Sequence, residues 1–300
     1  MRICFTIGLL VLLNVPGVTQ QQSHVTKSTI PFRLTEHNNL SIEAVINGSD
    51  TVDLMLHTAV DAVSIIQRVA KDLKSITWSE QAEVQSWGGA DISRSSHAND
   101  LSIQALEWDS LTIWECLHSG PLTDGKFGLN LFGDQIVELN FEEQQVLLHD
   151  SLPAKTKHYQ QFSLEWTKGM MFIEGTSIVG DSVFQNRYLI HSGYGGALLY
   201  DDQFVASTGI GNYLKITNTK SLKDSYGNVI QVQKAILPVF QIGDFEFSEV
   251  PVGFFEGAIG RQQMSVLGGD LLKRFNILID LKSRSIYLRP NSLMNLPYAN

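Results

Sequence analysis

An internal repeat constrains the fold of this chain more than any other feature. Residues 127–149, FGLNLFGDQIVELNFEEQQVLLH, align without a gap with residues 267–289, LGGDLLKRFNILIDLKSRSIYLR, at an offset of 140. Earlier in each half, an apolar stretch ends in a histidine and a turn: LMLHTA at residues 54–59 and YLIHSG at residues 188–193, at an offset of 134. The repeat therefore predicts two similar lobes in this chain of 300 residues.

The apolar runs are short and are separated by turn residues, which indicates a mainly β fold. Helical signals are few and fall at residues 65–73, 130–134 and 269–275. We expect an N-terminal lobe at residues 28–150, a polar linker at residues 151–160 and a C-terminal lobe at residues 161–291.

The two histidine turns, at residues 57–59 and 191–193, are here called the corners. Two matched corners in two similar lobes should meet near the axis that relates the lobes. We therefore expect His57 and His191 to be neighbours, although they lie far apart in the sequence. A single histidine on an apolar strand is commonly a core residue with a hydrogen-bond partner, but two at equivalent corners indicate one shared site.

The order of these motifs resembles the pepsin and retropepsin family of aspartic proteases, especially secreted bacterial members with two lobes. In that family each lobe has an apolar strand followed by Asp-Thr-Gly or Asp-Ser-Gly, and a later apolar-apolar-Gly segment crosses behind that loop. KFGLNLF and SVLGGDLLKRFNILIDLKSRSIYLRP match these later segments. The resemblance implies an all-β fold of two pepsin-like β-barrel lobes, with a cleft between them and few short helices.

One departure from the family decides the predicted chemistry. The family holds a water between two Asp carboxylates that share one proton, and His57 and His191 occupy both positions here. Thr58, Ser192 and Gly193 match the residues that brace the two family loops, whereas the first-lobe glycine is replaced by Ala59. The resemblance thus implies that this chain keeps the loop scaffold of the family and lacks the family's two catalytic carboxylates. This leaves it uncertain whether the chain is an enzyme.

Three interpretations of the histidine pair remain open. The site is inactive and the two rings hydrogen-bond to each other; or the rings share a metal ion with a third ligand; or one ring is a general base for residual hydrolysis. Zinc usually takes three or four protein ligands, and the sequence spacing places none of the candidates beside the pair. The prediction therefore includes no metal and no cofactor. The candidate third ligands are His97, His118, Asp61 and Asp202.

The segment EVQSWGGADISRSSH, residues 83–97, falls where the family has a hairpin flap over the cleft. Trp87, Gly88 and Gly89 would form its apolar tip and contact a bound peptide; the alternative is an ordinary surface hairpin. A flap could hold an extended peptide by strand-like hydrogen bonds without cleaving it.

Residues 1–21 have the pattern of a secretory signal peptide, so we expect a secreted or periplasmic protein with no other membrane association. If this segment is removed, Cys116 is the only cysteine that remains, and its apolar surroundings favour a buried thiol. The net charge of −9 and the absence of a basic run argue against nucleic-acid binding.

Together these features predict a catalytically degenerate peptidase of aspartic-protease type that binds a peptide or protein segment. The alternatives are an atypical active hydrolase that uses His57 and His191, as a general base or within a metal site, and a purely structural module.

Overall fold

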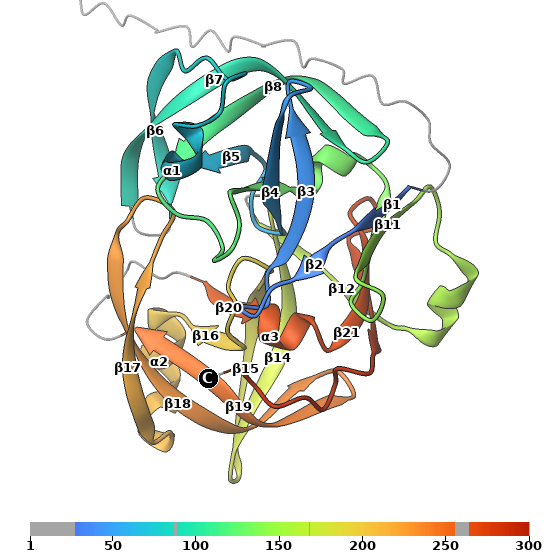
Figure 1. Ribbon diagram of the computed structural model, residues 1–300. Helices are drawn as coiled ribbons and strands as arrows, with labels where there is room; N and C mark the ends of the chain where they lie inside the picture. The colour runs from blue at the N-terminus through green and yellow to red at the C-terminus, as the bar shows by residue number, and fades with distance from the viewer. Residues whose placement is uncertain (1–27, 87–88, 168, 256–263, 300) are drawn as a thin grey trace, which may run out of the picture.

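The computed structural model describes residues 28–86, 89–167, 169–255 and 264–299 (Figure 1). Three sheets contain all of its strands. The first sheet has the strand order β2-β3-β4-β9-β5-β8-β7-β6, and a further pairing of β3 with β7 closes six of these strands into a barrel. Its strands are β2 (Arg33–Leu34), β3 (Leu40–Ile46), β4 (Asp50–His57), β5 (Val63–Ile66), β6 (Glu80–Ser86), β7 (Gly89–Ile103), β8 (Leu106–Cys116) and β9 (Gly125–Gly128).

The second sheet repeats this topology strand for strand. Its order is β13-β14-β15-β20-β16-β19-β18-β17, and pairing of β14 with β18 closes the second barrel. Two similar β-barrel lobes are therefore confirmed. The strands are β13 (Glu165–Thr167), β14 (Met170–Val179), β15 (Ser182–His191), β16 (Leu198–Tyr200), β17 (Ile216–Lys223), β18 (Val229–Ile242), β19 (Phe245–Phe255) and β20 (Ser265–Gly268).

The two lobes also share a third sheet, which the repeat alone did not predict. This sheet lies on the right in Figure 1 and takes three strands from each half of the chain, in the order β1-β11-β10-β21-β22-β12. The strands are β1 (Thr29–Pro31), β11 (Gln145–His149), β10 (Ile136–Asn140), β21 (Phe275–Asp280), β22 (Ser285–Pro290) and β12 (Gln160–Ser163).

The pairing of β10 with β21 shows where the pseudo-twofold axis passes. Glu138 lies opposite Leu278, and these residues are equivalent at the offset of 140. The neighbouring pairs are Val137 with Ile279 and Leu139 with Ile277. At the offset of 140, Val137 is equivalent to Ile277 and Leu139 to Ile279, so a twofold rotation exchanges the two pairs. The axis therefore runs between Glu138 and Leu278.

Helices are short, as the sequence predicts. The α-helices are α1 (Gln67–Ala70), α2 (Asp202–Thr208) and α3 (Gly269–Leu272), and the 3-10 helices are η1 (Leu129–Phe132), η2 (Ala154–His158) and η3 (Ile210–Tyr213). The sequence analysis missed α2, which has Asp201 as its N-cap and Gly209 in the left-handed conformation at its end. The expected linker contains η2 and leads directly into β12.

One large hydrophobic cluster extends through both lobes and the shared sheet. It includes Phe127 of the first barrel, Phe240 of the second and Phe275 of the shared sheet. Because the buried side chains of both lobes are continuous, the two corners that carry the histidines are held in a fixed relation to each other.

Candidate functional site

The two histidines end equivalent strands. His57 is the last residue of β4 and lies opposite Gly128 of the parallel strand β9. His191 is the last residue of β15 and lies opposite Gly268 of the parallel strand β20. Each barrel therefore presents its corner in the same way, because the repeated sequence forms the same pair of parallel strands in both lobes.

The two glycines allow each corner to turn back across its neighbouring strand. A Cβ atom on Gly128 would lie 2.0 Å from the carbonyl oxygen of Val60, and one on Gly268 would lie 2.2 Å from that of Gly196. Any side chain at either position would push the corner away from the strand. The apolar-Gly segments of the sequence thus support the corners directly.

Two hydroxyl groups bind the corners to each other across the axis. The Thr58 N–H donates to Ser192 Oγ over 3.0 Å, and that hydroxyl donates to the Leu56 carbonyl over 2.7 Å. In the reverse direction, the Ser192 N–H donates to Thr58 Oγ1 over 3.0 Å, and this hydroxyl donates to the Ile190 carbonyl over 2.6 Å. The four bonds are reciprocal and buried, so they fix the spacing of the two corners.

The corners bring the two imidazole rings into direct contact. The centroids of the His57 and His191 rings lie 4.5 Å apart, and the planes meet edge to face at 65°. Nδ1 of His57 accepts the Ala59 N–H over 3.1 Å, so a neutral His57 ring has its proton on Nε2. The contact agrees with the expectation that the two histidines are neighbours.

One of the three open interpretations included a hydrogen bond between the two rings, and the described residues do not form it. Among the described residues, the buried Nδ1 atom of His191 has no hydrogen-bond partner, and no hydrogen bond joins the two imidazoles. The physical reason lies in the local backbone: the Ala59 N–H already occupies Nδ1 of His57, and the rings meet edge to face.

Gly193 accounts for the position of the His57 ring. A Cβ atom on Gly193 would lie 2.3 Å from Nε2 and 2.4 Å from Cδ2 of His57, so the ring rests against the bare glycine. The equivalent first-lobe residue is Ala59, so the two corners differ at this position. The two rings are therefore placed asymmetrically, with His57 buried and His191 half-buried.

Burial is the main cause of the electrostatic properties of the pair. Desolvation lowers the pKa of His57 well below its usual value, and the charges of His191 and Lys126 lower it further. Desolvation and then the Lys126 charge lower the pKa of His191 to about 4. Both rings are consequently neutral at pH 7.

The two described aspartates nearest to His57 in the sequence do not act on the histidine pair. Asp53 forms an ion pair with Arg33, with 3.3 Å between Oδ2 and the guanidinium nitrogen, and Asp61 is exposed to solvent. In the part of the chain that the structure describes, no carboxylate is among the groups that shift the pKa of either histidine.

The candidate third metal ligands do not gather around the pair. Within the described ranges, no group of three or more His, Cys, Asp or Glu side chains is placed to hold a metal ion. The His97 ring instead contacts Thr112 Oγ1 at 3.0 Å and Ser95 Oγ at 3.3 Å, on an exposed part of β7. The thiol of Cys116 is buried, and burial raises its pKa.

The segment expected to form a flap is a β-hairpin. Strands β6 and β7 pair antiparallel, and Gly89, the first residue of β7, lies opposite Ser86. Trp87 and Gly88, which the sequence analysis placed at the apolar tip, lie outside the described residues. Their expected contact with a peptide stays a prediction.

Sequence reasoning missed a turn of the first lobe that contacts the second-lobe corner. The Asn39 side chain donates to the Ser192 carbonyl over 3.0 Å, and the Asn38 side chain donates to the Gly195 carbonyl over 2.7 Å. Lys273 of the second lobe donates to the Asn38 side chain over 2.9 Å. The sequence signal was a pair of adjacent asparagines, Asn38 and Asn39, ahead of a strand, which is also typical of an ordinary turn.

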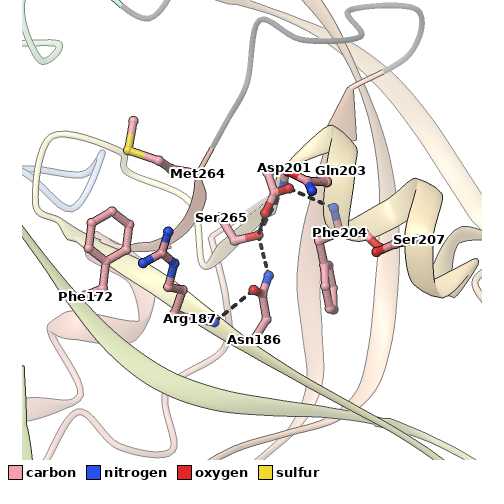
Figure 2. Close-up of a pocket in the computed structure, with 9 residues that line it drawn as sticks. All are labelled: Phe172, Asn186, Arg187, Asp201, Gln203, Phe204, Ser207, Met264 and Ser265. Atoms are coloured by element: carbon pink, nitrogen blue, oxygen red, sulfur yellow. Dashed lines mark hydrogen bonds between the residues drawn. The ribbon is translucent and has the colours of Figure 1, made fainter. Parts of the chain in front are cut away.

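A separate polar pocket of about 230 Å³ lies on the second lobe (Figure 2). At its centre, the Asn186 side chain donates to Ser265 Oγ over 2.9 Å, and Ser265 donates to Asp201 over 2.8 Å. The Arg187 guanidinium forms an ion pair with Glu165. These polar groups bind one another, so the histidine pair is the stronger candidate site.

The fold is similar to that of a solved aspartic proteinase. The crystal structure of aspartic proteinase from Irpex lacteus matches with a TM-score of 0.60 and 12% sequence identity, over 90% of this chain and 99% of that one. No family model matches the sequence, and no curated protein matches it by sequence. The chain therefore has the two-lobed, mainly β fold of the pepsin-like aspartic proteinases.

None of the helices in the described residues is both long enough and apolar enough to cross a membrane.

Proposed function

We propose that this chain is a secreted protein of aspartic-proteinase fold that no longer hydrolyses peptides and binds an extended peptide or protein segment between its lobes. One observation carries the proposal. Two imidazole rings lie 4.5 Å apart at the matched corners, and the hydroxyls of Thr58 and Ser192 bind these corners to each other. The sequence resemblance aligns the same corners with the two carboxylates of the family.

The chemistry of the pair supports the loss of hydrolysis. The family reaction needs one ionised carboxylate to take a proton from water and a protonated one to donate to the carbonyl oxygen. Two neutral imidazoles hold no shared acid proton between them. Their lowered pKa values also make both rings weak bases, because an efficient general base has a pKa near the working pH. This argues against the alternative of an active hydrolase based on the pair.

Three features support peptide binding. The corners keep the spacing set by four buried hydrogen bonds. Strand β6 is an edge strand of its sheet among the described strands, so an extended segment could pair with it. Neutral His57 presents a donor at Nε2, which can meet a peptide carbonyl.

Photo-cross-linking tests this proposal. Residues 22–300 are incubated with a mixed library of ten-residue peptides, each with one benzophenone side chain, and the adducts are located by mass spectrometry. We expect adducts at and next to the two corners, within residues 57–60 and 191–196, and on the β6–β7 hairpin.

Competition with the same peptides lacking the benzophenone should abolish these adducts. Ser182→Ala is a control variant: Ser182 lies at the turn of the β14–β15 hairpin, and its replacement should leave the adducts unchanged. Adducts confined to surfaces away from the corners, or no adducts above background, would contradict peptide binding and favour a purely structural module.

A further inference from the structure

The turn between β17 and β18 is shaped by one buried carboxylate. Asp224 accepts the N–H groups of Tyr226 and Asn228, each over 2.9 Å, and the Asn228 side-chain amide over 2.8 Å. Asp224 is only 2% exposed, and Gly227 has a φ of +92°, which favours glycine. Residues 224–228, here called the tip, thus form a turn with a defined shape.

The tip belongs to the second lobe but binds to the first. The Ser225 carbonyl accepts the N–H groups of Leu117 over 2.7 Å and His118 over 3.0 Å. The Lys126 amine donates to the Ser225 hydroxyl. A single residue of the tip therefore accepts from three hydrogen-bond donors of the opposite lobe. Leu117 and His118 follow the end of β8, and Lys126 lies on β9.

One of these donors, Lys126, lies near the histidine pair. Lys126 is paired with Met55 in the β4–β9 ladder, and His57 follows Met55 by two residues, on the same face of β4. The charge of Lys126 acts on both imidazole rings. In Figure 1 the β17–β18 hairpin rises on the same side of the molecule as the β6–β7 hairpin.

We propose that the tip is an intramolecular latch, which occupies the Leu117, His118 and Lys126 donors and has to be displaced before a peptide enters beside the histidine pair. This inference rests on the proposed function and adds its regulation. The rest of the hairpin can move with the tip, because β17 is exposed along almost its whole length and pairs only with β18 among the described strands.

The donors also indicate which segment competes best with the tip. Two adjacent backbone N–H groups fit a peptide carbonyl. Lys126 now donates to a neutral hydroxyl, and the Asp224 carboxylate of the tip acts on it through its charge. A segment with an acidic side chain next to that carbonyl would offer Lys126 a carboxylate, which forms a stronger, charge-assisted hydrogen bond. The displacing partner is therefore an extended acidic peptide.

Hydrogen exchange and peptide affinity test the latch in the chain of residues 22–300. Asp224→Ala removes the acceptor that shapes the tip. Ser221→Ala is the matched control, because Ser221 lies on the same hairpin in an exposed pair with Gln231. The peptide probes are the cross-linkable library and a subset with one Asp or Glu in every member.

We expect Asp224→Ala to speed exchange of the Leu117 and His118 amides by about tenfold or more, with the Phe127 amide unchanged. Affinity for the acidic peptides should rise by up to about the same factor, because the competent fraction increases. Ser221→Ala should change neither quantity. Ser225→Asp, which offers Lys126 a carboxylate, should slow the exchange and weaken peptide binding; it also serves if Asp224→Ala does not fold.

Each contrary outcome identifies what fails. Unchanged exchange at Leu117 and His118 in Asp224→Ala, or in Ser225→Asp, overturns the latch whatever the peptides do. Faster exchange with equal peptide affinity in wild type and variant overturns the gating role alone. Faster exchange with no peptide bound to any variant contradicts both the gating role and the proposed function.

Discussion

The contact between Gly193 and the His57 ring gives a prediction that can be worked from the geometry. A methyl group at residue 193 would lie 2.3 Å from Nε2 of His57, whereas ordinary contact begins near 3.4 Å, so the ring would have to move by about 1 Å. The ring has little freedom to do so, because Ala59 holds its Nδ1 atom and His191 packs against it. Overpacking of this kind typically costs about 1–3 kcal/mol.

We therefore expect Gly193→Ala to lower the free energy of unfolding by about 1–3 kcal/mol in urea titrations of residues 22–300. In a His57→Ala background the ring is absent and only the 3.1 Å approach to Cε1 of His191 remains, so the same change should cost less than about 1 kcal/mol. Gly193 is not among the glycines with positive φ, so the backbone itself accepts alanine. The difference between the two backgrounds is the coupling energy of a double-mutant cycle.

Gly211→Ala is the matched control, because its new methyl would meet Val205 at an ordinary 3.6 Å. It should change stability by no more than about 0.5 kcal/mol. An equal cost of Gly193→Ala in both backgrounds would refute the reasoning, because the penalty would then not come from the His57 ring. A negligible cost in the wild-type background would refute the packed geometry of the pair.

Three further predictions concern the same site. Both histidines have lowered pKa values in the folded protein, so the unfolded chain binds more protons and the free energy of unfolding should fall as the pH drops below about 6.5. The contribution of His191 should be fully lost once the pH falls below about 4. His191→Gln should therefore reduce the loss of stability between pH 7 and pH 5 in urea titrations, and an unchanged loss would contradict this. Thr58→Val should cost about 2–4 kcal/mol in the same titration, because it leaves the Ser192 N–H and a carbonyl without partners, and a cost near zero would show that the bracing bonds are dispensable. Lys126→Met should raise the pKa of both histidines in an NMR titration of their ring protons, and identical titration curves would exclude Lys126 as a cause of the shifts.

Much of the fold could be predicted because both halves of the chain have the same order of strands and turns in their sequence. The offset of 140 aligns the ends of the two halves, and these ends form the β10–β11 and β21–β22 hairpins. The shared sheet was missed because an alternating apolar pattern shows that a strand is half buried but not which strand it joins. Glu138 illustrates the limit, since this carboxylate is fully buried at the axis and bound by His149 and Lys155.

The site was predictable only to the level of its backbone. Symmetry brings His57 and His191 together, but the position of the His57 ring depends on the absence of a side chain at residue 193. The contact of Lys126 could not be predicted, because its partner, Ser225, is 99 residues away in the sequence and lies on a turn of the other lobe. Contacts of this kind depend on how lobes pack, which the local sequence pattern does not record.

In the proposed function, the site has kept its shape and lost its acid pair. The most direct test of this claim is a peptidase assay on residues 22–300 between pH 3 and pH 8, with a mixed peptide library, with and without chelator, beside the double variant His57→Asp/His191→Asp. We expect no cleavage by the natural chain and measurable cleavage by the double variant at acidic pH. Cleavage by the natural chain would contradict the claim, and its sensitivity to chelator would then distinguish a metal site from a histidine base.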